Sequence, residues 1–153
     1  MDIKYINPFI SGFLNVCSLL GMKTWQRSSL DRQDTLRIEQ EVNIIIGLTG
    51  ETRGNVVLSM SELTARSIAS TMMGGLPVEQ FDMMARSALC ELTNMVAGNS
   101  ATNLAEHGTQ INITPPTLIS GKNLLALVSQ IETLVIEFTG QEGKLVINIA
   151  LES

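Results

Sequence analysis

The chain has 153 residues, of which 44% are hydrophobic and 16% are charged. This length suffices for one domain with a buried core and is short for two, and the composition is typical of a globular protein rather than a disordered one. A net charge of −5 argues against nucleic acid and against an anionic membrane as the main partner, because both are bound through basic patches. We therefore predict a single domain over residues 1–153.

Two features bear on the compartment. The N-terminus lacks the basic-then-apolar order of a secretion signal, and no apolar run reaches the ~18 residues that a membrane-spanning helix needs. Cys17 and Cys90 are the only cysteines and lie far apart. A disulfide between them stays open on spacing alone, but two lone thiols without a signal peptide are typical of reduced proteins. We expect a cytoplasmic protein with free thiols that does not associate with a membrane.

The first elements in chain order are a helix and a less regular polar segment. Asn7-Pro8 is a good helix start, with Asn7 as the cap and Pro8 at the first helical position. Apolar residues then recur at helical spacing until Gly21, which ends the predicted helix. The polar residues 24–38 are ambiguous, and we expect one or two strands there.

A hairpin and a second helix follow. Residues 42–48 and 55–60 are rich in β-branched side chains, and the turn residues 49–54 separate them, so the pair predicts a β-hairpin. Ser61 is placed to cap the next helix, which we expect to stop at Gly74-Gly75.

The second half contains the longest predicted helix and then only strands. The helix is expected from about Glu79 to His107, closed by Gly108. Pro115-Pro116 interrupts the region after it, because central strands do not tolerate proline. The expected strands are 111–114, 117–120, 124–128, 134–138 and 145–151. This order predicts an α+β fold, in which helices pack on one face of an antiparallel or mixed sheet.

One face of the long helix carries a polar stripe, which we define as Ser87, Glu91, Asn94 and Gly98. At 100° per residue these four positions fall within an arc of roughly 60°. The simplest interpretation is a solvated helix face. However, a glycine in the interior of a helix costs about 1 kcal/mol relative to alanine, so Gly98 in line with Glu91 and Asn94 favours a face that another molecule contacts.

The rest of the helix is expected to be structural. Asn99 and Asn103 fall on the apolar side, where we predict buried amides tied to backbone groups, because a buried amide without partners is costly. His107, the only histidine, is expected to cap the helix end, where the helix dipole favours a cation. The methionine pairs 72–73 and 83–84 are expected to fill the core. The predicted core face consists of Met84, Ala85, Ala88, Leu89, Leu92, Met95 and Val96.

The stripe is also where a resemblance becomes specific. Ser87-x-x-x-Glu91-x-x-Asn94, continuing as Met95-Val96-Ala97-Gly98-Asn99, resembles the signature of the CheC/CheX/FliY phosphatases of bacterial chemotaxis. One copy of the motif is similar to CheX, whereas CheC proteins usually carry two, and Gly12-x-x-Asn15 would then be the remnant of a lost first site. The agreement extends to Ile6-Asn7-Pro8-Phe9, to residues 45–50 and 54–59, and to Ile113-Thr114-Pro115-Pro116-Thr117.

The resemblance implies a CheC-like fold and a substrate. That substrate is the aspartyl phosphate of a CheY-like receiver domain, where a divalent ion (Mg²⁺) and a lysine of the receiver already hold the phosphoryl group. Asn94 would orient the attacking water and Glu91 would pair with that lysine, with Ser87 and Gly98 in supporting roles. No cluster of His, Cys and carboxylates in the sequence has the spacing of metal ligands, so we expect no metal or cofactor in the protein itself. The resemblance also implies a homodimer whose sheets join.

Two other functions remain open on the sequence. The chain could be a non-catalytic CheX-like module that binds a receiver or dimerises in a two-component pathway, or a structural dimer with a solvated Glu/Asn face. The intact pair Glu91 and Asn94 favours the phosphatase over both.

Overall fold

The computed structural model describes residues 3–152. Within this range a short 3-10 helix, Ile3–Tyr5, leads into the α-helices. The α-helices are α1 (Ile6–Leu19), α2 (Glu62–Met72) and α3 (Met83–Glu106). The strands are β1 (Gln26–Gln33), β2 (Leu36–Ile38), β3 (Val42–Gly50), β4 (Gly54–Met60), β5 (Ile111–Ile113), β6 (Thr117–Ser120), β7 (Ala126–Ser129), β8 (Thr133–Gly140) and β9 (Gly143–Leu151). The predicted order of one helix, strands, two helices and strands is confirmed.

The main sheet has seven strands in the order β1-β8-β9-β4-β3-β5, and β6 also pairs with β3. Each of its strand pairings is antiparallel, which resolves the choice between an antiparallel and a mixed sheet. Pro115-Pro116 lies between β5 and β6, and both of these strands pair with β3. This placement fits proline, which has no N–H to donate and is therefore confined to edges and interruptions.

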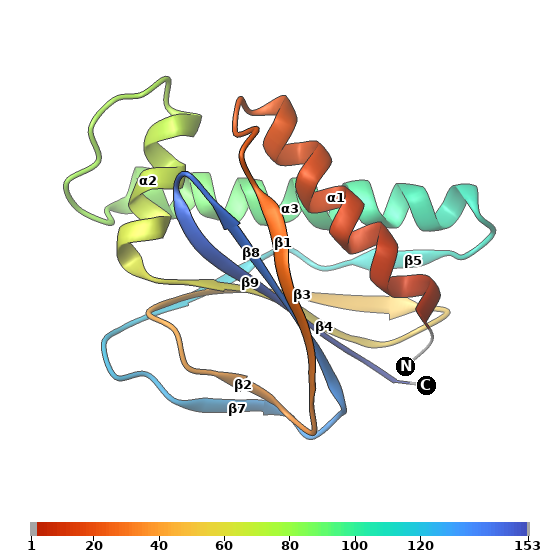
Figure 1. The fold of residues 1–153 in the computed structure, drawn as a ribbon. Helices are drawn as coiled ribbons and strands as arrows, with labels where there is room; N and C mark the ends of the chain where they lie inside the picture. Colours follow the sequence, from red (N-terminus) through yellow and green to blue (C-terminus); the bar gives the residue numbers. More distant parts are fainter. Residues whose placement is uncertain (1–2, 153) are drawn as a thin grey trace.

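The three helices cover one face of this sheet, and the small β2–β7 ribbon lies on the other side (Figure 1). The α+β class with helices on one face is therefore confirmed. The helix-side residues of the hairpin β3–β4 alternate with those of the other face, because side chains in a strand point to opposite sides in turn. Ile44 and Ile46 of β3 thus lie fully buried beneath the helices.

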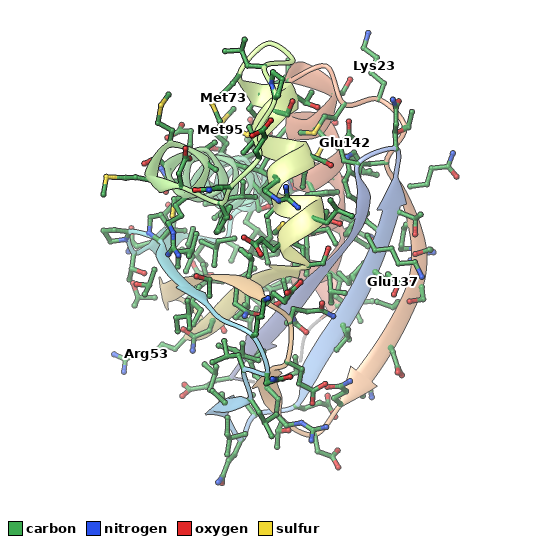
Figure 2. All side chains as sticks on the ribbon, turned by 90° about the vertical axis from the view of Figure 1, so that its left-hand side faces the viewer. Lys23, Arg53, Met73, Met95, Glu137 and Glu142 are labelled. Carbon is green, nitrogen blue, oxygen red and sulfur yellow. The ribbon has the colours of Figure 1, made fainter. Side chains whose placement is uncertain are left out.

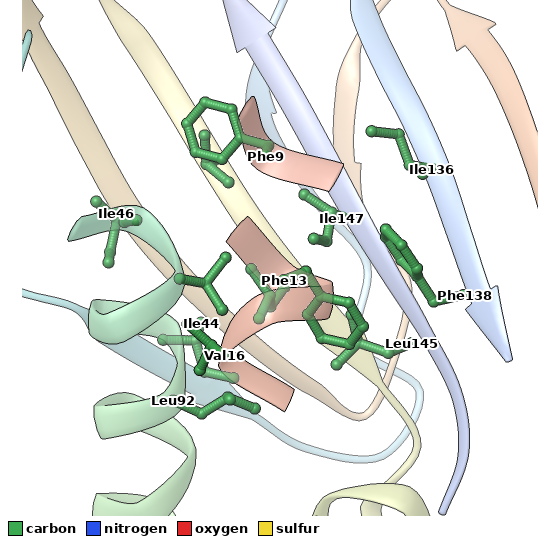
Figure 3. Packing of buried hydrophobic residues seen from close by; sticks show 14 of the residues in the cluster. Phe9, Phe13, Val16, Ile44, Ile46, Leu92, Ile136, Phe138, Leu145 and Ile147 are labelled. Carbon is green, nitrogen blue, oxygen red and sulfur yellow. The ribbon is translucent and has the colours of Figure 1, made fainter. Parts of the chain in front are cut away.

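The core lies between the helices and the sheet, and Figure 3 shows its centre. Phe13 of α1 packs against Phe138 of β8 at a ring-centroid distance of 4.5 Å, and against Trp25 edge-on at 5.5 Å. All three rings are at least 95% buried. Leu92 joins this cluster from α3, so the helix that carries the polar stripe is fixed to the sheet by its opposite side.

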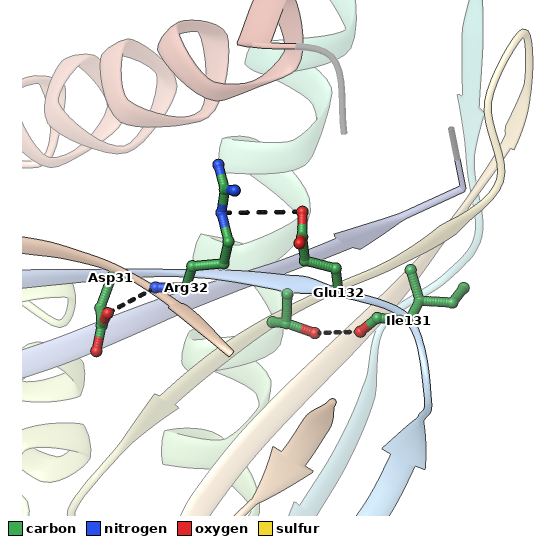
Figure 4. A network of polar contacts seen from close by, with 5 residues as sticks. Asp31, Arg32, Ile131 and Glu132 are labelled. Atoms are coloured by element: carbon green, nitrogen blue, oxygen red, sulfur yellow. Dashed lines mark hydrogen bonds and ion pairs between the residues drawn. The ribbon is translucent and has the colours of Figure 1, made fainter. Parts of the chain in front are cut away.

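The other face of the sheet has a smaller apolar cluster around Leu36, Val57 and Ala150. At the β1 edge of the sheet, the backbone N–H of Arg32 donates to Asp31 Oδ1 at 2.8 Å, and Arg32 Nε lies 3.8 Å from Glu132 Oε1 (Figure 4). These side chains are exposed, and exposed ion pairs contribute little to stability. The hydrogen-bonded ladder between β1 and β8 is what holds this edge.

Helix α1 begins earlier than predicted. Its N-cap is Tyr5, which makes no side-chain capping bond, and Asn7 lies inside the helix. Tyr5 is 95% buried, and burial of this ring outweighs the capping preference of an exposed asparagine. The predicted end is confirmed: Gly21 has φ of +86°, and the N–H of Met22 donates to the Cys17 carbonyl at 2.8 Å, the bond of a Schellman motif.

Both cysteines are free, as predicted. Burial, with a smaller contribution from the charge of Glu142, raises the pKa of the Cys17 thiol to about 12. Burial also raises the pKa of Cys90, although the positive charge of Arg86 opposes that change. Neither group is a thiolate near neutral pH, so neither is a nucleophile in this fold. No helix within residues 3–152 is both long enough and apolar enough to cross a bilayer.

Candidate functional site

Helix α3 presents the candidate site, and both of its ends are well defined. Asp82 caps the start, where its Oδ1 accepts the N–H of Ala85 at 2.9 Å. The expected start at Glu79 is therefore wrong, because Pro77 lies in a loop and the acidic cap comes just before Met83. At the other end Gly108 has φ of +87°, and His107 Nδ1 lies 2.8 Å from the Asn103 carbonyl, which confirms the capping position of the histidine.

The polar stripe lies on the side of α3 that faces away from the sheet. Ser87, Glu91 and Asn94 are exposed and Gly98 is partly exposed. The opposite side packs on the core through residues that are at least 97% buried: Ala85, Leu89, Leu92, Val96 and Leu104. Solvent exposure of the predicted stripe is thus confirmed.

The side chains of the stripe are unengaged by the rest of the chain. Glu91, Asn94 and Ser87 make no hydrogen bond or ion pair with any residue from 3 to 152. The supporting role expected for Ser87 therefore does not involve a hydrogen bond of its side chain within residues 3–152. Asn94 and Glu91 project from adjacent turns of one helix, about 4.5 Å apart along its axis, so their spacing is fixed before any partner arrives.

Gly98 lies in open space. A Cβ built there would meet no atom within 4 Å, so packing within the chain does not require glycine at this position. Ala101 and Ala105 continue the same face as partly buried small residues. Small residues therefore form part of the surface that carries Glu91 and Asn94, and these two longer side chains project from it.

Three predictions for the neighbouring positions are wrong. Met84, placed on the core face, is 69% exposed, and Met83 is 81% exposed. The core lies on the far side of the helix from Glu91, so Met84, seven residues before Glu91, points outward with it. Asn99 and Asn103 are partly exposed rather than buried, and within residues 3–152 their carboxamides make no hydrogen bond.

Gly12-x-x-Asn15 on α1, which the resemblance suggests is the remnant of a lost site, has a structural explanation. Gly12 lies at the crossing of α1 and α3, where a Cβ would come within 2.5 Å of Ser100 Oγ and 3.2 Å of the Val96 carbonyl. A glutamate at position 12 would therefore collide with α3, whereas Asn15 is exposed. Gly12 serves the packing of the two helices, and in this chain α3 leaves no room for a side chain at position 12.

The geometry limits the chemistry that the site can perform. Within residues 3–152 no group of three or more His, Cys, Asp or Glu side chains is arranged to hold a metal ion. Ser87 makes no hydrogen bond with a histidine or lysine of residues 3–152 that would activate it as a nucleophile. What remains is a carboxamide and a carboxylate at fixed spacing, able to orient a water molecule and to pair with a cation on another molecule.

Comparisons with known proteins show the family to which the chain is similar. The family model "Chemotaxis phosphatase CheX" matches residues 42–139, a range that contains all of α3. A relative from Thermotoga maritima, named CheY-P phosphatase CheX, is 37% identical over 127 residues, which are 81% of this chain and 80% of the relative.

Solved structures show the same fold. A chemotaxis protein CheX from Desulfovibrio desulfuricans aligns with a TM-score of 0.87 at 22% identity, over 98% of this chain and 100% of that one. A chain of the CheX-CheY-BeF3-Mg²⁺ complex from Borrelia burgdorferi aligns with a TM-score of 0.80 at 28% identity, over 99% of this chain and 100% of that one. The CheC-like fold expected from the sequence is confirmed.

Proposed function

The chain belongs to the chemotaxis phosphatase CheX family, and we propose that it hydrolyses the aspartyl phosphate of a phosphorylated CheY-like receiver domain. The observation that carries the proposal is the pair of exposed, unengaged side chains Glu91 and Asn94 on one outward face of α3. It is supported by the 37% identity to a CheY-P phosphatase and by the solved CheX-CheY complex.

Asn94 orients the water that attacks phosphorus. An acyl phosphate is already activated, so the enzyme has to place a water in line and stabilise the charge that develops. A carboxamide suits this role because its oxygen accepts a hydrogen bond from the water and its NH₂ donates another, while it is not itself a competing nucleophile. The water oxygen bonds to phosphorus as the bond from phosphorus to the aspartate oxygen breaks. Inorganic phosphate leaves with the protons of the water or releases one of them to solvent, and the receiver keeps its aspartate as a carboxylate.

Glu91 anchors the receiver. Its carboxylate pairs with the receiver lysine beside the phosphoryl group, and α3 holds it one turn before Asn94. Ser87 and Gly98 support the contact from the same face. The divalent ion belongs to the receiver, an assignment supported by the Mg²⁺ of the solved CheX-CheY-BeF3-Mg²⁺ complex.

The proposal also covers the domain organisation, the compartment and the oligomeric state of the protein. We take residues 1–153 as one cytoplasmic domain that acts as a homodimer. The strand edges that the sheet leaves for pairing with a second copy are β1 on one side and β5 with β6 on the other. An exposed edge offers unpaired backbone groups to another chain.

The test mixes the protein with phosphorylated receivers and follows the release of inorganic phosphate. We expect release faster than the receiver's own rate for at least one CheY-like receiver. If no receiver loses phosphate faster but one binds, the non-catalytic receiver-binding module takes the place of the enzyme.

A further inference from the structure

The first turn of α3 exposes two large apolar side chains next to the polar stripe. Met83 is 81% exposed and Met84 is 69% exposed, whereas the next residue, Ala85, is fully buried. Met84 lies two turns before Glu91 on nearly the same line of the helix, and Met83 lies on the side of Asn94. We propose that Met83 and Met84 form the apolar end of the receiver-docking face, contacting apolar side chains that border the phosphorylation site of the receiver. This inference rests on the proposed function.

The polar stripe lacks the apolar contacts from which protein–protein interfaces take much of their affinity. Glu91 and Asn94 are exposed, and a solvent-exposed ion pair contributes little affinity because water and salt screen it. A stable protein–protein contact buries roughly 800 Å² on each partner and takes most of its affinity from a few apolar or aromatic anchors. The stripe itself offers a serine, a carboxylate, a carboxamide and a glycine, so apolar contacts with the receiver have to come from its borders.

Met83 and Met84 lie on the same outward face of α3 as the polar stripe. From Met84 to Gly98 the outward face of α3 spans fourteen helical steps, which cover about 21 Å along the axis. Figure 2 looks along α3, and the side of this helix away from the sheet is open, with Met95 labelled at its margin. Met95 is partly buried against the core, whereas Met83 and Met84 extend into solvent. The methionines therefore continue the face that carries Glu91 and Asn94 rather than forming a separate patch.

Hydrogen bonds hold the backbone of the loop before α3 and of its first turn in place. The loop before α3 is fixed to α2, because Ser70 Oγ donates to the Leu76 carbonyl at 2.7 Å and Arg66 Nη1 donates to the Glu79 carbonyl at 3.1 Å. Asp82 then caps the helix. The backbone of the first turn is thus set in the free protein, and the flexible methionine side chains adapt to the partner surface.

The test replaces both methionines by glutamine, which matches methionine in length and helix propensity. In Met83→Gln/Met84→Gln we expect the KM for the phosphorylated receiver to rise about tenfold or more while kcat stays within about twofold. Titration with a beryllofluoride-activated receiver should show the same loss of affinity. Leu125→Gln is the matched control, because Leu125 is 71% exposed but lies beside β7 on the other side of the sheet (Figure 1).

The outcomes separate the inference from the proposed function. If the wild type binds the receiver without accelerating phosphate loss, the enzyme proposal fails, and weaker binding by the double variant still supports the docking face. A double variant with unchanged KM and unchanged receiver affinity overturns the inference. A change in the oligomeric state of the double variant, with unchanged receiver affinity, would assign the methionines to a second copy of this chain and also overturn it. If no receiver binds the wild type, both proposals fall.

Discussion

The substitution Gly98→Ala separates stability from function at the proposed docking face. Gly98 is in the interior of α3, and a Cβ there meets no atom within 4 Å. Alanine should therefore stabilise the helix by about 1 kcal/mol, the difference in helix propensity. For a domain of this size that corresponds to a rise in Tm of about 2–4 °C.

The same methyl group should impair catalysis. If the receiver backbone approaches the face at Gly98, an added methyl in that closed contact costs about 1–3 kcal/mol. We expect kcat/KM for the phosphorylated receiver to fall by about five- to 150-fold in a protein that is more stable than the wild type. Thermal unfolding and phosphate release on the same preparation measure both effects.

Gly12→Ala is the matched control. Its Cβ would lie 2.5 Å from Ser100 Oγ, which donates to the Pro8 carbonyl at 3.1 Å and to the Val96 carbonyl at 2.8 Å. Overpacking at this crossing should destabilise the protein by about 1–3 kcal/mol. If Gly98→Ala were as active as the wild type, the close approach at Gly98 would be refuted. If it were destabilised like Gly12→Ala, the open space around Gly98 would be refuted.

Two further predictions concern charge and protonation. Glu91→Ala should raise the KM for the receiver by about three- to tenfold. Added salt should raise the KM of the wild type more than that of the variant, because salt screens an exposed ion pair. An equal response of the two KM values to salt would contradict the anchoring role of Glu91. The pKa of Cys17 is about 12 in the folded protein against 9.0 for the free thiol, so the folded state holds the proton more tightly. Its contribution is fully present below pH 9 and is lost as pH rises toward 12, by at most about 1.4 kcal/mol per pH unit. Urea unfolding should therefore show the stability difference between wild type and Cys17→Ala shrinking from pH 8 to pH 11, and a constant difference would contradict the burial of this thiol.

Features set by local sequence were predictable. The hairpin of β3 and β4, the Ser61 cap and the Gly21 helix end depend on side chains within a few residues of one another. Ser61 Oγ accepts the N–H of Thr64 at 3.1 Å, as the sequence suggests. The polar stripe was predictable for the same reason, because helical periodicity places its four residues together wherever the helix packs.

Features set by packing were not predictable. Helical periodicity defines which residues share a face of α3, but the direction of the sheet decides where the buried arc ends. Met84 lies at that border and turns outward. The role of Gly12 depends on a contact with Ser100, 88 positions away, and a resemblance to a two-site family suggests a remnant there rather than a helix crossing. The start of α3 depends on a loop that α2 holds through Arg66 and Ser70.

We propose that Asn94 acts on the attacking water and that receiver docking does not depend on it. The most direct measurement is phosphate release from the phosphorylated receiver by Asn94→Ala, combined with titration of the beryllofluoride-activated receiver. Asn15→Ala is the control, because Asn15 is likewise an exposed asparagine but belongs to α1 and not to the polar stripe. We predict that Asn94→Ala abolishes the acceleration while its receiver affinity stays within a few-fold of the wild type, and that Asn15→Ala changes neither. An Asn94→Ala variant as active as the wild type would contradict the account.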